Sequence, residues 1–298
     1  MPPVLMALEA MGTRFEAVLV GEDEFALRSA GEAAFEEIRS LHARLSAFEQ
    51  GSVVSLLNQR AAAGPVRVAG DVFGLLSLCR GVWEASGGAF DPTVGPLMRL
   101  WGFRQRGGED WNPPTDAEVE AARARVGMNL VQLDAESWSV RFSRPGVAVD
   151  FGAVAKGYAL DMCAEVLRER GVACAFVHGG TSSISAIGAP PGAAGWVVEV
   201  KSPIEGVGSK RVSLRDESMS VSAPHGREVM VRGERLGHVI DPRTGRPARG
   251  AALAAVVSRS GALADAWSTA GLVLGGGADR LPEGMRMMVL SQGGVWEG

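Results

Sequence analysis

Residues 147 to 161 read Val-Ala-Val-Asp-Phe-Gly-Ala-Val-Ala-Lys-Gly-Tyr-Ala-Leu-Asp, and the interpretation of the fold starts from this stretch. Val147 and Val149 alternate as in a β-strand, whereas from Val154 onward apolar residues recur at helical spacing. Gly171 then ends the helix. The helical stripe consists of Tyr158, Met162, Val166 and Leu167. The sequence therefore predicts a strand that runs directly into a helix through Asp-Phe-Gly-Ala.

The junction between this strand and this helix suits an anionic ligand. It offers the Asp150 carboxylate, a turn of small residues, the amides of a helix N-terminus and the Lys156 ammonium in the first turn. Helix N-termini bind phosphate or pyrophosphate through free amides, and glycine lets a ligand approach the backbone. The alternative interpretation is an ordinary strand-to-helix turn in which Lys156 is a solvated charge.

The rest of the chain places helices and strands in runs. Asp71 is expected to cap a helix, and residues 87–103, rich in Gly, Pro, Asp and aromatics, are expected to form a loop. Without regular alternation of strand and helix, the predicted fold class is α+β, with residues 1–298 as one domain of at most two lobes. The predicted helices cover 23–47, a short segment ending near 58, 71–86 and 115–127; the predicted strands cover 14–20, a hairpin over 129–143, 173–178, 183–188, 195–201, 210–215, 217–222 and 228–232.

The amino-acid composition is typical of an ordinary globular protein. The chain has 298 residues, 46% hydrophobic and 21% charged, with a formal net charge of −4, and this length buries a core without disulfides. It contains no basic run with interleaved aromatics, so we expect no nucleic-acid partner. Cys79, Cys163 and Cys174 have neither CxxC nor metal-ligand spacing and are predicted to be buried thiols.

From the N-terminal residues we expect no export signal. Residues 1–10 lack a basic region, and their apolar stretch is broken at Glu9. No run approaches roughly 18 apolar residues, so we expect no membrane-spanning segment. The expected location is the cytoplasm for the sequence as written, or the periplasm if a leader segment once preceded it.

Residues 261–275, Gly-Ala-Leu-Ala-Asp-Ala-Trp-Ser-Thr-Ala-Gly-Leu-Val-Leu-Gly, give the sharpest local signal. Asp265 and Thr269 are four apart in a helical pattern, so their oxygens project from one face. A carboxylate and a hydroxyl are hard ligands that suit Mg²⁺ shared with a substrate phosphate. Alternatively, Asp265 faces the helix dipole and Thr269 bonds back to a backbone carbonyl.

A second signal is His238-Val-Ile-Asp-Pro-Arg-Thr-Gly245. The turn residues from Asp241 to Gly245 place His238 at the end of a strand against a loop. A histidine there can act as a general base near neutral pH. Alternatively, His238 bonds the backbone and Asp241 only caps the turn. His42, inside a predicted helix, is interpreted as structural or solvated.

These stretches and several others match, in the same order, the motifs of one family over nearly the whole chain, from Met11 to about Gly275. Together they resemble the ApbE family of FAD:protein FMN transferases. The resemblance implies a Mg²⁺-dependent enzyme with antiparallel sheets flanked by helices. Such an enzyme cleaves the pyrophosphate of FAD, attaches FMN through a phosphoester to a threonine of a partner flavoprotein, and releases AMP. The matching motifs are Met11-Gly-Thr13, Ser46-Ala-Phe48 followed by Asn58, Gly87-Gly-Ala-Phe-Asp91-Pro-Thr with Leu100-Trp-Gly-Phe103, Asp150-Phe-Gly-Ala-Val-Ala-Lys156-Gly-Tyr, Gly179-Gly180, His238 to Gly245, and Ala264-Asp265-Ala-Trp-Ser-Thr269.

The resemblance also implies residue roles. His238 would take the proton from the acceptor threonine. Mg²⁺, with Mn²⁺ as an alternative ion, would be bound by Asp265, Thr269 and the backbone carbonyl of Ala153. The residues implied to contact FAD are Met11, Phe48, Ala89, Phe90, Asp91, Asp150, Lys156 and the backbone near Val239.

Three stretches depart from the family pattern. Val177-His178-Gly-Gly-Thr181 stands where members usually have Asn-x-Gly-Gly-Asp, Ser222-Ala-Pro-His225 stands where they have Ser-Gly, and Ser52-Val-Val-Ser lacks an acidic residue. The predicted metal-binding face and His238 are intact. Two other hypotheses remain: a Mg²⁺-dependent FAD pyrophosphatase that gives free FMN and AMP, and a non-catalytic FAD-binding protein.

Overall fold

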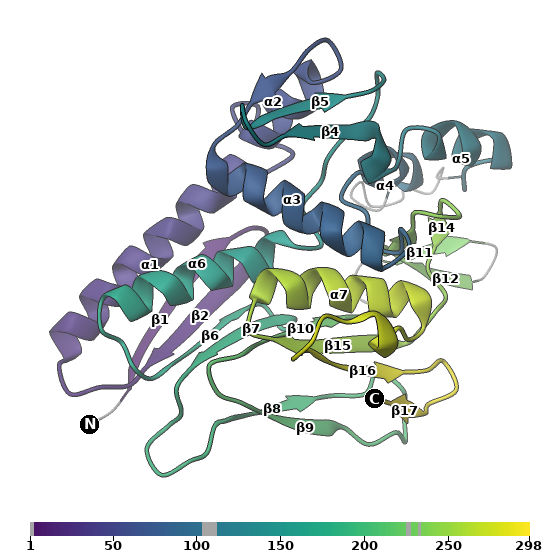
Figure 1. The fold of residues 1–298 in the computed structure, drawn as a ribbon. Helices are drawn as coiled ribbons and strands as arrows, with labels where there is room; N and C mark the ends of the chain where they lie inside the picture. Colours follow the sequence, from purple (N-terminus) through teal and green to yellow (C-terminus); the bar gives the residue numbers. More distant parts are fainter. Residues whose placement is uncertain (1–2, 103–111, 225–227, 232–233) are drawn as a thin grey trace.

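A computed structural model describes residues 3–102, 112–224, 228–231 and 234–298. Phe103 and His225 lie outside these residues. The largest sheet is antiparallel, with strand order β1-β2-β6-β7-β10-β15-β16-β17 (Figure 1). Its strands are β1 (Val4–Ala10), β2 (Thr13–Leu19), β6 (Ala175–Gly179), β7 (Ser183–Ile187), β10 (Ser218–Ser222), β15 (Leu253–Ser258), β16 (Arg286–Leu290) and β17 (Trp296–Glu297).

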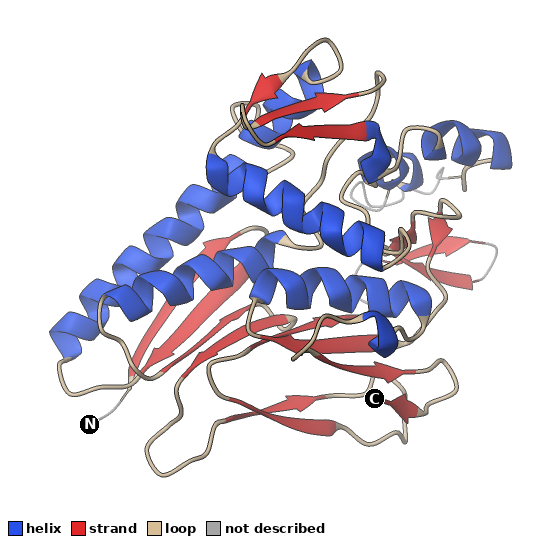
Figure 2. Cartoon of the chain, viewed as in Figure 1, coloured by secondary structure: helices blue, strands red, loops and turns tan. Residues whose placement is uncertain are grey.

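Helices α1 (Glu24–Leu45), α6 (Ala155–Glu169) and α7 (Gly261–Leu274) cover one face of this sheet, and α3 (Gly70–Ala85) packs above them (Figures 1 and 2). The described residues also form four smaller antiparallel sheets beside the large sheet. The fold class is therefore α+β, as predicted. The remaining elements are α2 (Val53–Arg60), α4 (Gly95–Trp101), α5 (Asp116–Arg123), 3₁₀ turns at Met128–Leu130 and Ala278–Arg280, the sheet β3-β5-β4 (Val66–Arg67, Ser139–Phe142, Val131–Asp134), and the pairs β8-β9 (Trp196–Val200, Lys210–Leu214), β11-β12 (Glu228–Val231, Glu234–Gly237) and β13-β14 (Ile240–Asp241, Arg246–Pro247).

Strand β15 is buried along its whole length because it carries apolar residues on both faces. Successive side chains of a strand point to opposite faces. Ala254 and Val256 belong to the cluster under the helices, whereas Ala255 and Val257 belong to a second cluster. The β8-β9 hairpin contributes to that second cluster, which makes the middle of the sheet an interior layer.

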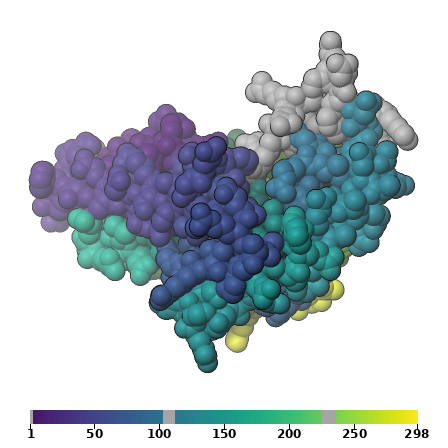
Figure 3. Space-filling model, turned by 90° about the horizontal axis from the view of Figure 1, so that it is seen from above, coloured from purple at the N-terminus to yellow at the C-terminus, as the bar shows by residue number. Residues whose placement is uncertain are grey.

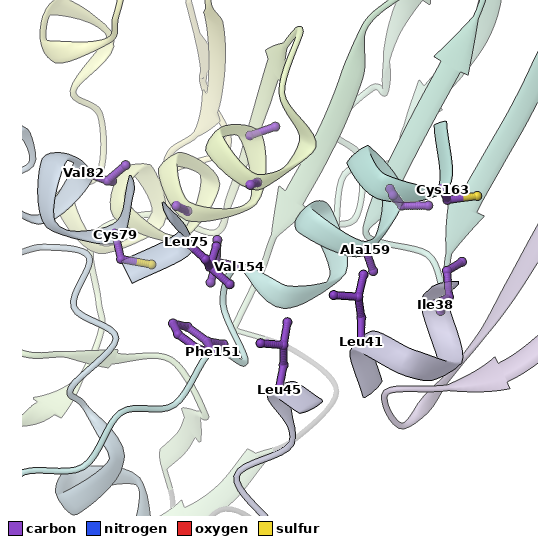
Figure 4. Close-up of a cluster of buried hydrophobic side chains, with 14 of the residues drawn as sticks. Ile38, Leu41, Leu45, Leu75, Cys79, Val82, Phe151, Val154, Ala159 and Cys163 are labelled. Carbon is purple, nitrogen blue, oxygen red and sulfur yellow. The ribbon is translucent and has the colours of Figure 1, made fainter. Parts of the chain in front are cut away.

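The helical layer encloses the junction that the sequence singled out. Phe151 and Val154 are buried beside Leu45 of α1 and Leu75 of α3 (Figure 4). Viewed from the helical side, α1 occupies one end of the surface, the residues of α5 lie at the other, and α2 and α3 lie between them (Figure 3). The strand-to-helix junction is therefore packed from several sides, which restricts where its backbone can lie.

The prediction of buried thiols is confirmed for two of the three cysteines and is wrong for Cys174. Cys79 and Cys163 are buried and Cys174 is half-buried. Burial raises the pKa of the Cys163 thiol to about 12, and it raises the pKa of Cys79 as well. Because the thiolate is the nucleophile and the metal ligand, these two cysteines are chemically inert near neutral pH.

The predicted strand over residues 147–149 is wrong. The segment is extended, but it joins none of the described sheets; Ala148 forms a single bridge with Val94, and the Asp150 amide donates to the Pro92 carbonyl at 2.7 Å. The Asn58 side chain bonds both backbone groups of Val149, accepting from its N–H at 2.7 Å and donating to its carbonyl at 2.9 Å. One side-chain amide thus takes the place of a neighbouring strand.

Residues 95–101 form helix α4, although they were predicted to be part of a loop. Pro96 lies in the first turn, where its missing N–H costs no helical hydrogen bond. Leu97 and Trp101 are buried on one side, and the Trp101 indole donates to the Gly245 carbonyl at 2.8 Å. Gly102 ends the helix in the left-handed conformation, with φ of 64°. Distant packing therefore decides a segment whose local composition favours a loop.

Further details differ from the prediction. Helix α3 begins at Gly70, so Asp71 is not its cap; Asp71 lies in the first turn and pairs with Arg44 of α1. On α6, Tyr158 and Met162 are only half-buried, and the fully buried face is formed by Leu160, Cys163, Ala164 and Leu167. Strand β1 was not predicted at all. The capping box of Thr115 and Glu118 at the start of α5 is confirmed.

Among the described residues, no helix combines the length and the apolar character that are needed to cross a bilayer.

We predict that Asn58→Ala lowers the free energy of unfolding by about 1–3 kcal/mol, because it leaves the amide and carbonyl of Val149 without their partner. Urea denaturation measures this change. Asn112→Ala, at an exposed position, is the matched control and should stay within about 0.5 kcal/mol of the unsubstituted protein. Equal effects of the two substitutions would contradict the structural role of Asn58.

Candidate functional site

The first turns of α6 and α7 meet at the carboxylate of Asp265, which is 3% exposed. Its Oδ2 accepts the Gly157 amide at 3.1 Å, and its Oδ1 accepts the Ser220 hydroxyl at 2.7 Å. The Lys156 ammonium lies 3.9 Å from Oδ2. A buried carboxylate is tolerated when it is hydrogen-bonded and paired in this way. The dipole that Asp265 faces is that of the neighbouring helix α6, not its own.

Thr269 lies one turn further along α7 on the same face. Its hydroxyl donates to the Asp265 carbonyl at 3.3 Å, which is the back-bonding alternative left open by the sequence. It also lies 3.3 Å from the Ser222 hydroxyl. Ser220 and Ser222 were not among the predicted site residues. The alternation of serines at 218, 220 and 222 in β10 was the available signal, because it places three hydroxyls on one face of the strand.

The donor atoms at this place suit a hard cation. They are the Asp265 carboxylate and the hydroxyls of Thr269 and Ser222. Ala153, whose carbonyl the family resemblance implies as a further ligand, lies in the turn before α6. Within the described ranges, no group of three or more His, Cys, Asp or Glu side chains gathers in a metal-binding arrangement. Mg²⁺ commonly uses one or two carboxylates and takes its other ligands from substrate phosphates and water, so this oxygen set fits Mg²⁺.

The loop of residues 87–93 turns its side chains inward. Ala89 and Phe90 are each 1% exposed, and Asp91 is 6% exposed. The Asp91 carboxylate accepts the amide of Thr93 at 2.8 Å and also its hydroxyl. Burial raises the pKa of Asp91 to about 6, although the bonds from Thr93 partly oppose this shift. Any contact that this loop makes with FAD would therefore come from its backbone, with Gly87 and Gly88 at positive φ.

The other predicted FAD contacts come from separate parts of the chain. Met11 lies in the tight turn between β1 and β2 and has a positive φ of 51°. Phe48, between α1 and α2, leaves 68% of its surface exposed. Val239 is half-buried, and its carbonyl accepts the amide of Ala248 at 2.8 Å. An exposed aromatic ring and a left-handed turn are both suited to contact a ligand.

His238 directly follows β12 and is half-buried, so its predicted position at the end of a strand is confirmed. Asp241 forms a two-point ion pair with Arg243 at 2.9 Å and accepts the backbone amide of Arg243 at 3.0 Å. Its carbonyl also accepts the amide of Gly245 at 2.8 Å. Asp241 therefore holds the turn, which is the structural alternative that the sequence left open.

Hydrogen bonds join most of these stretches into one continuous framework. The Asp150 amide is bonded to Pro92 in the loop, and the same segment continues into the first turn of α6 at Asp265. The Val221 amide of β10 donates to the Ser182 carbonyl at 2.7 Å, which joins β10 to the β6-β7 turn beside the turn at Met11. The bonds described above do not reach Phe48 or His238.

A surface depression of about 560 Å³ lies elsewhere, at the far end of α6. Its lining includes Arg168 from the last turn of α6, whereas Lys156 and Gly157 lie in the first turn. The depression shares no residue with the framework around Asp265. Its lining residues are Arg168, Arg215, Asp216, Glu217 and Arg259.

In this antiparallel α+β fold, a buried carboxylate, a lysine and a helix N-terminus lie together at one point. This arrangement is typical of the class of proteins that bind a phosphorylated ligand through a hard cation. Comparison with known proteins makes the class specific. The family model described as ApbE family matches residues 11–288, and the chain belongs to that family.

Individual relatives agree with this assignment. The chain is 32% identical over 280 residues to a Rhodobacter capsulatus protein named FAD:protein FMN transferase, covering 92% of this chain and 52% of that protein. It thus spans about half the length of that relative. It is 30% identical over 296 residues to a Klebsiella pneumoniae protein of the same name, covering 96% and 81% of the two chains. The crystal structure of the Thermotoga maritima ApbE protein superposes with a TM-score of 0.90 at 30% identity, covering 99% and 96%. The predicted ApbE-like fold is therefore confirmed.

We predict a pH-dependent stability that originates at Asp91. Because burial raises its pKa from 3.8 to about 6, the folded protein holds this proton more tightly than the unfolded chain does. The resulting stabilisation is fully present below about pH 4 and is lost as the pH rises through 6. Asp91→Asn cannot titrate there. Between pH 4 and 7, the unsubstituted protein should therefore lose at most about 3 kcal/mol of unfolding free energy relative to Asp91→Asn. Urea denaturation of both proteins across this pH range measures the change. A difference in unfolding free energy that stays constant with pH would contradict a raised pKa for Asp91.

Proposed function

We propose that this protein is a Mg²⁺-dependent FAD:protein FMN transferase. It cleaves the pyrophosphate of FAD, attaches FMN through a phosphoester to a threonine of a partner flavoprotein, and releases AMP. The observation that carries the proposal is the Asp265 carboxylate at the N-terminus of α6 with Lys156 at 3.9 Å. The shared name of the two relatives, FAD:protein FMN transferase, supports the same reaction.

The reaction exchanges one phosphorus–oxygen bond for another. The hydroxyl oxygen of the acceptor threonine bonds to the FMN phosphorus, and the bond from that phosphorus to the oxygen bridging to AMP breaks. His238 accepts the hydroxyl proton, and AMP leaves with the bridging oxygen. Little other covalent work falls to the protein, so catalysis rests on positioning and on charge stabilisation.

The charged residues at the site divide this work. Mg²⁺, held by Asp265, Thr269 and the Ala153 carbonyl, would neutralise charge on the pyrophosphate. Lys156 is 23% exposed, so its ammonium can reach a phosphate while its stem packs against the protein. Its position near Asp265 keeps it in the first turn of α6, where the helix dipole also favours negative charge on the ligand.

The flavin and the acceptor would occupy the open side of the framework. Phe48 presents an exposed aromatic face of the kind that stacks on a planar ring. The backbone of residues 87–93 is held rigid from behind by Asp91, so it can serve as a fixed wall. Asp150 lies between that loop and α6, and its carboxylate accepts the Gly152 amide at 2.8 Å, which shapes the turn before the helix.

The decisive experiment measures AMP release from FAD with Mg²⁺, with and without a threonine-containing acceptor flavoprotein, and reads covalent flavin on the acceptor by mass. We expect AMP together with an acceptor mass gain equal to FMN. Asp265→Asn should reduce turnover at least about 100-fold, because it removes the only charged metal ligand of the proposed set.

Asp279→Asn is the matched control, since Asp279 is an exposed aspartate outside the site. AMP without flavin on the acceptor would favour the pyrophosphatase, and bound FAD without AMP would favour a non-catalytic binder. Full activity of Asp265→Asn would refute the metal site.

A separate substitution tests the general base. We predict that His238→Asn lowers the transfer rate by about 10²- to 10⁴-fold while leaving FAD affinity nearly unchanged, because it removes proton transfer but not the pyrophosphate site. Stopped assays give the rate, and flavin fluorescence gives the affinity. His42→Asn in helix α1 is the control and should transfer at the unsubstituted rate. A His238 variant that transfers equally fast would exclude this role.

A further inference from the structure

Helices α6 and α7 carry the same short pattern near their N-termini, a glycine in the first turn followed four residues later by an aspartate. In α6 it is Gly157-Tyr-Ala-Leu-Asp161, and in α7 it is Gly261-Ala-Leu-Ala-Asp265. Each aspartate accepts a hydrogen bond from the glycine amide of the other helix: Asp265 Oδ2 from Gly157 N at 3.1 Å, and Asp161 Oδ1 from Gly261 N. The two helices therefore bind each other reciprocally at their N-termini.

The two glycines allow the backbones to touch. A Cβ atom on Gly157 would lie 2.0 Å from the Gly261 carbonyl oxygen and 2.8 Å from the Cβ of Asp265. A Cβ atom on Gly261 would lie 2.6 Å from the Gly157 carbonyl oxygen and 2.9 Å from Asp161 Oδ1. Any side chain at either position would push the helices apart. This close approach brings the Asp265 carboxylate within reach of the Gly157 amide.

Asp161 holds the α7 side of this contact. Besides Gly261, its carboxylate accepts the Ser260 hydroxyl at 2.9 Å and the Ala262 amide at 3.0 Å, both on Oδ2. A residue of α6 thus satisfies two of the unpaired amides at the start of α7, a role that a cap residue normally performs within its own helix. Asp161 sets the position and rotation of the turn that directly precedes Asp265.

We propose that Asp161 is a positioning residue for the cation site. It fixes the first turn of α7 against α6, so that Asp265 Oδ2 faces Gly157 and Lys156 while Oδ1 accepts the Ser220 hydroxyl of β10. It acts through α7 and is not itself a metal ligand. The identity of the cation in this inference rests on the proposed function. The hydrogen bonds between the two helices do not depend on it.

Asp161→Asn tests this role with nearly unchanged volume. Three donors face the two oxygens of Asp161, and replacing either oxygen by an NH₂ group sets a donor against a donor. We expect the Mn²⁺ concentration for half-saturation, measured by electron paramagnetic resonance with FAD present, to rise about 10-fold. Hydrogen exchange should also become faster in the first turns of both helices.

Asp23→Ala is the matched control. Asp23 caps α1 by accepting the Ala26 amide at 2.9 Å, at a helix end far along the chain from α7. Loss of that cap should lower the thermal midpoint by about 2–4 °C without changing Mn²⁺ binding or exchange in α6 and α7. If Asp161→Asn also changes only the thermal midpoint, the positioning role is overturned.

Ser260→Ala is the second variant if Asp161→Asn fails to fold. It removes one donor to Asp161 and leaves the two backbone amides, so half-saturation should rise by only about 2- to 3-fold; an unchanged value would overturn the inference. If the unsubstituted protein binds no Mn²⁺ with FAD, the inference fails with the cation site. If it binds Mn²⁺ but releases no AMP, the proposed function fails, while the variants still decide the role of Asp161.

Discussion

The backbone contact between Gly157 and Gly261 is the constraint on which the rest of the structure depends. Helix α6 packs on α1, which lies over the N-terminal strands, whereas α7 packs on β10 and β15. Contact between their first turns therefore ties the two halves of the sheet's helical layer together at one point. Because no side chain fits between the two backbones, their spacing is set by direct backbone contact and by the two hydrogen bonds from the glycine amides to the aspartate carboxylates.

Three carboxylates organise the region, of which Asp91 and Asp265 are buried and Asp161 is half-buried, and each accepts backbone amides. Asp91 bonds Thr93 in the loop, Asp161 bonds the first turn of α7, and Asp265 bonds the first turn of α6. Burial raises the pKa of Asp91 and of Asp161. At Asp265, the Lys156 ammonium lies 3.9 Å from Oδ2, and the Ser220 hydroxyl of β10 donates to Oδ1. That polar surrounding is the reason why we propose Asp265, and not Asp91 or Asp161, as the cation ligand.

Local periodicity and capping chemistry predicted much of the fold, including the long helix α1, the β4-β5 hairpin and the capped start of α5. What could not be predicted depends on distant partners. The extended segment at Val149 is held by the side chain of Asn58, 91 residues away, and α4 is stabilised by contacts with a turn 144 residues away. Neither contact leaves a periodic pattern in the local sequence, so a strand and a loop were predicted in their place.

The site shows the same division between motif and packing. Ala89, Phe90 and Asp91 match a family motif as a unit, yet all three side chains are buried. A matched motif therefore does not say whether a residue contacts the ligand or holds the backbone that does. Ser220 and Ser222 show the converse: Ser220 belongs to no motif named in the sequence, and Ser222 was named only in a stretch that departs from the family pattern, yet their hydroxyls lie against Asp265 and Thr269. Burial and hydrogen-bond partners, which only the folded chain defines, decide which of these residues can act on a ligand and which hold the others in place.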